Sequence, residues 1–131
     1  NENAGAFQCE YEFFKHIYKI ESRASMRDGR HIYLAILTLS PDNATELSLK
    51  KQNTLMEKLV YCVKYSLRNS DIFARLSLSQ YIILLETPSL ENAQMVMERI
   101  IKRFKKDNPK KHVTLTYALK SVTKDKKKTR N

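Results

Sequence analysis

Glycine is scarce in this chain of 131 residues, which contains only Gly5 and Gly29. A phosphate-binding P-loop needs two glycines close to a lysine, and the dinucleotide-binding fingerprint needs three that are closely spaced. Because the two glycines lie far apart in the sequence, neither of these nucleotide-binding loops can be built. Tryptophan is absent as well.

Long hydrophobic runs are also missing. No stretch approaches the length of about 18 apolar residues that a membrane helix needs, and no apolar leader with a cleavage site is visible. The sequence therefore predicts neither a membrane span nor a signal peptide, and we expect a cytoplasmic location. The chain opens on Asn-Glu-Asn without a methionine, which favours a piece of a larger protein.

Residues that commonly hold metals are few. Cys9 and Cys62 form no C-x-x-C pair, and His16, His31 and His112 are scattered, so no metal site and no cofactor is predicted. Both cysteines fall in stretches with apolar periodicity, where a buried free thiol is the usual role. A reduced compartment fits this use of cysteine.

The net charge of +10 belongs to the last quarter of the chain. Residues 102–131 carry twelve lysines and arginines against two aspartates, whereas residues 1–101 carry twelve of each sign. A lysine-rich end can bind phosphate backbones, but it is more often a solvated helix end followed by a frayed tail. No aromatic residue stands among Lys124–Arg130 to stack on a base. We therefore expect residues 123–131 to form a basic, disordered tail.

Hydrophobic periodicity predicts three helices and four strands between these ends. Asn43 followed by Glu46 resembles a capping box at the start of the second helix, and Ser89 is the expected N-cap of the third. The helices are expected at 10–27, 43–67 and 89–108, and the strands at 31–39, 71–76, 80–85 and 113–119.

The order of elements is one helix followed by β-α-β-β-α-β. This order is typical of the ferredoxin-like α+β architecture, an antiparallel sheet with helices packed on one face, here with an extra N-terminal helix. We expect one domain over residues 1–122. The architecture by itself assigns no function, because many functions share it.

One segment, from Leu67 to Leu85, carries a family resemblance. An R-x-x-D element, Arg68 to Asp71, precedes a short strand that ends in Arg75, then a turn, then an apolar strand. This arrangement resembles the signature hairpin of the GGDEF (diguanylate cyclase) family, and the element order agrees over about residues 7–122. The resemblance implies a nucleotide-cyclase-like fold. The five signature positions fall on Ser77, Leu78, Ser79, Gln80 and Tyr81, and none of the five letters is retained.

The departures from the family pattern concern its chemistry. The family joins two GTP molecules with the help of two metal ions, and the resemblance places the metal-binding acids on Thr38 and Ser79. Neutral hydroxyls are poor substitutes for the carboxylates that Mg²⁺ prefers at a triphosphate. The guanine-reading aspartate of the family falls near Asn53. The resemblance therefore implies a degenerate domain that is not an enzyme and holds no metal.

We interpret the chain as a catalytically inactive GGDEF-like regulatory or protein-interaction module of a larger bacterial signalling protein. The C-terminal module of a transcriptional activator or response regulator would suit it. Its expected partners are other domains of the parent chain or a signalling protein, and a homodimer is a further option.

Two alternative functions stay open. In the first, Arg68 and Asp71 bind cyclic di-GMP or another nucleotide, with the arginine fork on the acceptor pair of guanine and the carboxylate on its N1–H and N2–H donors. In the second, the basic region Lys102–Arg130 binds nucleic acid. Saturable, salt-tolerant nucleotide binding would favour the first, and salt-dependent binding to generic strands would favour the second.

Overall fold

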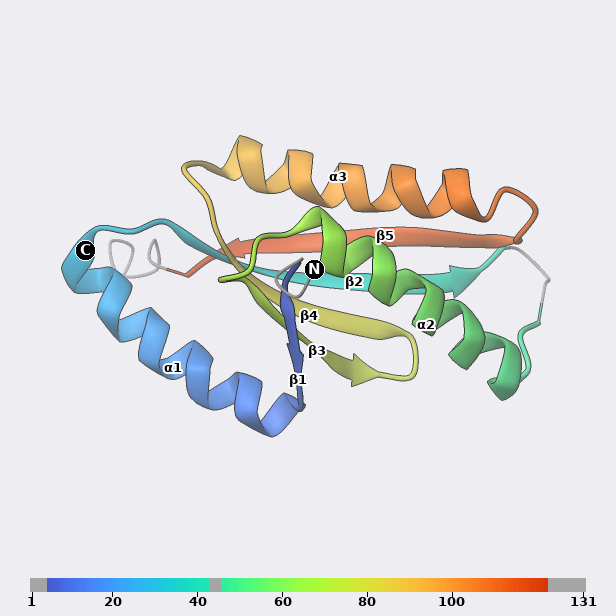
Figure 1. The fold of residues 1–131 in the computed structure, drawn as a ribbon, viewed down its shortest axis with the longest axis horizontal. Coiled ribbons are helices and arrows are strands. Elements are labelled where there is room, and N and C mark those ends of the chain that lie inside the picture. The colour runs from blue at the N-terminus through green and yellow to red at the C-terminus, as the bar shows by residue number, and fades with distance from the viewer. Residues whose placement is uncertain (1–4, 43–45, 123–131) are drawn as a thin grey trace, which may run out of the picture.

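The computed structural model describes residues 5–42 and 46–122, so the expected tail at 123–131 and the expected cap at Asn43 lie outside the described residues. The described part folds into a sheet of five strands with three helices (Figure 1). The strands are β1 (Phe7–Cys9), β2 (Ile32–Pro41), β3 (Ile72–Ser77), β4 (Gln80–Glu86) and β5 (Val113–Ser121), and the helices are α1 (Tyr11–Asp28), α2 (Leu49–Ser66) and α3 (Leu90–Asp107).

The strands follow the order β1-β3-β4-β2-β5 across the sheet. The pairs β3–β4, β4–β2 and β2–β5 are all antiparallel, which confirms the α+β fold expected from the sequence. Strand β4 pairs with one edge of β2 from Gln80 to Glu86, and β5 pairs with the other edge of β2. The central position of β2 explains why its residues are almost continuously apolar.

Strand β1 was not predicted from the sequence. It adds a parallel strand at the edge of the sheet, where Phe7 pairs with Ile72 and Cys9 with Ala74. The first residue of β1 and the residue before it make two further backbone hydrogen bonds. The amide of Ala6 donates to the carbonyl of Lys64 at 2.9 Å, and the amide of Phe7 donates to that of Asp71 at 3.0 Å.

Helices α2 and α3 cover one face of the sheet, as the ferredoxin-like pattern predicts, and the extra N-terminal helix α1 covers the other face. Tyr33, Leu37 and Leu39 of β2 pack in the core under α2 and α3, together with buried residues of those helices. Ile32 and Ile82 point to the opposite face, where they pack with Phe14 of α1 in a second cluster. Alternate residues of a strand face opposite sides, and Figure 1 shows α1 lying apart from the α2–α3 pair.

The first helix ends, and the third begins, within one residue of the positions that the sequence predicts. Gly29 has a left-handed backbone (φ 75°) and its amide donates to the carbonyl of Ser25, which ends α1. Ser89 caps α3 by accepting from the amide of Asn92 at 3.1 Å.

The expected start of α2 was wrong. Glu46 precedes the helix, and the cap is Ser48, whose hydroxyl accepts from the amide of Lys51 at 3.1 Å. Serine is as good an N-cap as asparagine, which explains why the helix can begin at this later position.

Candidate functional site

The signature turn joins β3 to β4 at one end of the sheet. Ser77 pairs with Gln80, and the register shifts between Arg75 and Ser77. Leu78, at the tip, is 58% exposed. A glycine at this tip would leave the backbone open to a phosphate group, whereas Ser77 and Leu78 place side chains there.

The two positions that the resemblance assigns to metal ligands lie close together. Thr38 pairs with Gln80 in the β2–β4 register, and the backbone amide of Leu39 donates to the carbonyl of Ser79 at 2.9 Å. The side-chain amide of Gln80 donates to Thr38 Oγ1 at 3.2 Å and its Oε1 accepts from the Ser77 hydroxyl at 3.0 Å. The neutral groups at this site therefore hydrogen-bond to one another.

Arg75 ties the turn to helix α2. Its Nε donates to the carbonyl of Ser77 at 2.8 Å, and its Nη2 donates to the carbonyl of Leu78 at 2.8 Å. The same Nη2 donates to Asn53 Oδ1 at 3.1 Å, and the guanidinium lies 5.8 Å from the ring centroid of Tyr81. Several donors of this arginine are thus engaged within the protein, and Asn53 of α2 is one of its partners.

Tyr81 anchors the turn in the core. It is fully buried, its ring meets Phe73 edge-on, and its hydroxyl donates to the carbonyl of Met56 at 3.0 Å. Burial raises the pKa of the Tyr81 phenol, although the nearby Arg75 opposes the shift. The hydroxyl therefore acts as a structural donor to α2.

Arg68 and Asp71 lie at the junction between α2 and β3, as the R-x-x-D pattern predicts. The Asp71 carboxylate is 4% exposed and accepts two backbone hydrogen bonds, one from Arg68 at 3.0 Å and one from Glu86 at 3.2 Å. Burial raises the pKa of Asp71, while these two amides lower it in part. The carboxylate thereby fixes the junction to the end of β4.

The Arg68 side chain hydrogen-bonds to the backbone at the end of β4. Its Nη2 donates to the backbone carbonyl of Glu86 at 2.6 Å, and the residue is exposed. In the described part of the chain, no ion pair joins its guanidinium to Asp71. A nucleotide at this position would meet the remaining donors of an exposed arginine, and it would share the oxygens of Asp71 with two amides.

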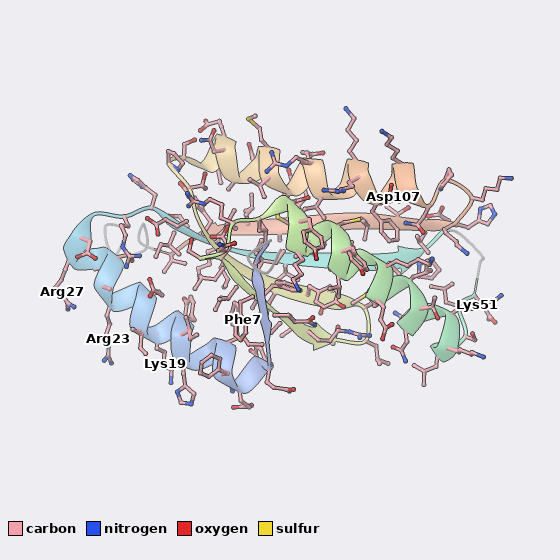
Figure 2. The ribbon with its side chains drawn as sticks, in the orientation of Figure 1. Phe7, Lys19, Arg23, Arg27, Lys51 and Asp107 are labelled. Carbon is pink, nitrogen blue, oxygen red and sulfur yellow. The ribbon has the colours of Figure 1, made fainter. Side chains whose placement is uncertain are left out.

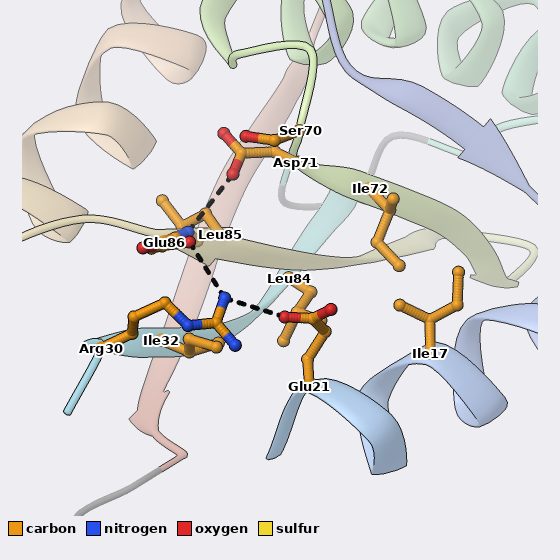
Figure 3. A pocket seen from close by; sticks show the side chains of 10 residues that line it. All are labelled: Ile17, Glu21, Arg30, Ile32, Ser70, Asp71, Ile72, Leu84, Leu85 and Glu86. Carbon is orange, nitrogen blue, oxygen red and sulfur yellow. Dashed lines mark hydrogen bonds and ion pairs between the residues drawn. The ribbon is translucent and has the colours of Figure 1, made fainter. Parts of the chain in front are cut away.

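A small cavity on the α1 side of the sheet was not foreseen from the sequence (Figure 3). It measures about 190 Å³. Arg30 crosses it and donates to Glu21 Oε1 of α1 at 3.0 Å and to Glu86 Oε1 of β4 at 3.3 Å. These partners are distant in sequence, so no local pattern could identify them. The bonds attach α1 to the same end of β4 that Asp71 holds.

Neither metal clusters nor membrane helices occur in residues 5–42 and 46–122. No group of three histidine, cysteine or acidic side chains is placed to hold a metal ion there. The described helices also lack the combined length and hydropathy that crossing a bilayer requires.

Solved structures with this fold are GGDEF and diguanylate cyclase proteins. A DGC protein from Thermotoga maritima has a TM-score of 0.71 and 15% identity, over 93% of this chain and 84% of that one. The GGDEF domain of DgcB from Caulobacter crescentus, in complex with c-di-GMP, has a TM-score of 0.69 and 10% identity, over 88% of this chain and 77% of that one. The diguanylate cyclase SiaD from Pseudomonas aeruginosa, in complex with its activator SiaC, has a TM-score of 0.65 and 18% identity. The match covers 84% of this chain and 45% of that one.

No protein-family model matches the chain, and none of the curated proteins does. The resemblance to solved structures shows the fold, which is the one that the hairpin from Leu67 to Leu85 implied.

Proposed function

Because the chain has the fold of the GGDEF domains, we propose that it is a degenerate, catalytically inactive GGDEF-like module of a bacterial signalling protein. The main support is the hydrogen bond from Gln80 to Thr38 at 3.2 Å. It joins two neutral side chains at the place where the resemblance assigns acidic groups. The module would act by binding other domains or a protein partner.

The chemistry of the family explains why these substitutions matter. Oxygen ligands for Mg²⁺ at a triphosphate are usually carboxylates, whose charge helps to displace the tightly held waters of the ion. Thr38 and Ser79 offer no charge. Ser77 and Leu78 also replace the glycines through which the family backbone approaches phosphate.

A regulatory role follows from keeping the fold without the catalytic groups. SiaD, which shares the fold, is a cyclase in complex with its protein activator. In this chain, exposed apolar side chains at Phe7, Phe13 and Leu78 are available for contacts with protein. A parent protein of the transcriptional activator or response regulator type would use the module as a docking domain.

The test of inactivity is incubation of the purified chain with GTP and Mg²⁺ or Mn²⁺, followed by chromatography for cyclic di-GMP. We expect no product, both for the chain alone and for a fusion in which a coiled coil enforces dimerisation. An active diguanylate cyclase fused in the same way is the positive control. Product that is lost in a Thr38→Val, Ser79→Ala variant would refute the proposal.

Binding of cyclic di-GMP at Arg68 and Asp71 stays a prediction, and the complex of DgcB with c-di-GMP is the observation that favours testing it. Calorimetry with the ligand at about 100 μM would detect binding in the micromolar range. Heat that disappears in Arg68→Ala and persists in Arg23→Ala, an exposed arginine on α1, would support a receptor. No heat, or heat unaffected by Arg68→Ala, would remove this site.

A further inference from the structure

Two tyrosines of α2 stack on the surface of the protein. Tyr61 is 67% exposed and Tyr65 is 42% exposed. Their ring centroids lie 5.7 Å apart with an angle of 22° between the planes, and Lys64 Nζ lies 5.9 Å from the ring centroid of Tyr65. Residues four apart share one face of a helix, so the two rings form a small aromatic platform directed away from the core.

Basic side chains surround this platform from both helices. Lys58 of α2 and Arg103 of α3 line a cavity of about 380 Å³ with the two tyrosines, and Asp107 is the one acidic residue that lines it. Among the described residues, no ion pair involves Lys58 or Arg103. The two cations are therefore available to an anionic ligand.

The basic surface continues toward the start of α2 and the end of α3. Figure 2 shows Lys51 and Asp107 near these two ends. A second cavity, of about 560 Å³, lies between the start of α2 and the connection from α3 to β5. Its lining includes one acidic residue, Glu46, against four lysines and a histidine: Lys50, Lys51, Lys110, Lys111 and His112.

The lysines at the start of α2 are electrostatically unfavourable for the helix itself. The first turn contains Lys50 and Lys51 and no acidic residue, although the positive end of a helix dipole favours acidic side chains. Local choices that oppose the fold are expected at functional sites. Together, the two cavities give a basic surface along α2 and α3 with an aromatic pair on it.

We propose that this surface, defined by Lys51, Lys58, Tyr61, Tyr65 and Arg103, binds single-stranded nucleic acid. Unpaired bases stack on the two tyrosine rings, and the phosphates lie beside the lysines and the arginine. Single-strand binding proteins combine a positive groove with aromatic side chains in this way, with little dependence on base sequence.

A protein partner fits this surface less well. Protein interfaces are enriched in tyrosine and arginine but depleted in lysine, and two lysines, Lys58 and Lys64, lie beside this platform. A duplex fits less well too, because its bases are already stacked and cannot cover the tyrosine rings. The inference goes beyond the proposed regulatory function, and the GTP assay does not depend on it.

The direct test is fluorescence anisotropy with a labelled thymidine strand of about 12 nucleotides, within the range that single-strand binding domains cover. The full chain should bind it, and Tyr61→Ala, Tyr65→Ala should weaken binding about tenfold or more, because each stacked base contributes substantially to affinity. The double phenylalanine variant keeps the rings and should bind within about twofold of the wild type.

Charge is tested separately through the dependence on salt. Lys58→Ala, Arg103→Ala should flatten the plot of log affinity against log salt by about 0.7 for each phosphate that is no longer neutralised. The matched control is Lys19→Ala, Arg23→Ala, which removes the same charge from the outer side of α1 (Figure 2). Phe13→Ala on α1 is the control for removal of an exposed aromatic ring.

Asp107 provides a change of opposite sign. Asp107→Asn removes the acidic group that lines the platform cavity and should tighten binding of the strand by a few-fold, because a repulsion with the phosphates is removed. Circular dichroism of each variant separates loss of binding from loss of folding.

Several results would overturn the inference. They are no binding by the wild type, equal weakening by the α1 controls, or binding that survives both tyrosine-to-alanine changes. A polyglutamate peptide that competes as well as the strand and loses affinity in the same tyrosine variant would indicate an acidic protein partner in place of nucleic acid.

Discussion

Gln80 and Thr38 are joined by a hydrogen bond of 3.2 Å between the side-chain amide and the hydroxyl, across the paired ends of β4 and β2. Gln80 also accepts from Ser77 within the turn. The GGDEF resemblance implies acidic groups at this position. The pair places neutral groups there instead, and these groups hydrogen-bond to each other. A group whose hydrogen bonds are satisfied internally gains little from an added cation.

The first prediction concerns metal binding at this pair. The wild type should show no change in melting temperature with Mg²⁺ or Mn²⁺, because no carboxylate stands at Thr38 or Ser79. A Thr38→Asp, Ser79→Glu variant should lose stability without metal and regain it with Mn²⁺, since two adjacent carboxylates repel until a cation binds. Thermal unfolding measures both. The neutral variant Thr38→Asn, Ser79→Gln is the control, and a metal response in it or in the wild type would contradict the prediction.

The second prediction compares the two glycines, both of which have positive φ. A Cβ at Gly5 would clash with the backbone carbonyl oxygen of Lys64, whereas a Cβ at Gly29 would meet nothing within 4 Å. Gly29→Ala should therefore cost about 1 kcal/mol from backbone strain alone. Gly5→Ala should cost about 2 kcal/mol or more, because a steric clash is added. Urea denaturation measures both, and equal losses would show that the segment before β1 moves aside freely.

The third prediction concerns acid and Asp71. Its folded pKa is raised above the ordinary value of 3.8, mainly by burial. A carboxyl with a higher pKa in the folded state binds its proton more tightly there, so its contribution to stability is complete below that ordinary value. The contribution is lost as the pH rises through the folded pKa.

The measurement subtracts the unfolding free energy of Asp71→Asn from that of the wild type at each pH. The difference should fall as the pH rises above the ordinary value of 3.8 and through the folded pKa. A difference that grows with pH would mean that the two amide donors, from Arg68 and Glu86, outweigh burial.

The fourth prediction concerns the thiols. Cys62 is 2% exposed and Cys9 half-buried, both are free, and burial raises the pKa of each. Because the thiolate is the reactive form, both should react slowly with a disulfide reagent at neutral pH. In a Cys9→Ser variant, Cys62 should react only as fast as the protein opens. Rapid labelling of Cys62 in the folded variant would contradict its placement in the core.

Local features were predictable from the sequence, and long-range ones were not. Gly29 and Ser89 end and begin helices through bonds within four residues, so their roles follow from residue type. Strand β1 was missed because three residues are too few to show an alternating pattern. The start of α2 was misplaced because Asn43 and Ser48 are equally good caps.

The candidate site likewise has features that the sequence predicts and long-range contacts that it does not. The hairpin resemblance assigned family roles to Thr38, Asn53 and the turn, and the structure shows that Asn53 bonds to Arg75 and Thr38 to Gln80. It gave no sign that Arg75 would bond to both the turn and α2, nor that Tyr61 would be exposed beside Arg103 of α3. These contacts join segments that are far apart in the chain, so only the fold brings them together.

The backbone bonds made by Ala6 and Phe7 have a mechanical consequence. They attach one short segment to the carbonyls of Lys64 and Asp71, which stand on either side of the junction that carries Arg68. Together with the bonds of Arg68 and Asp71 to Glu86, they hold that junction against the sheet. Because Ala6 is itself buried in the core beneath α2 and α3, a force that lifts the N-terminal segment would disturb that core and the junction that carries Arg68 at once.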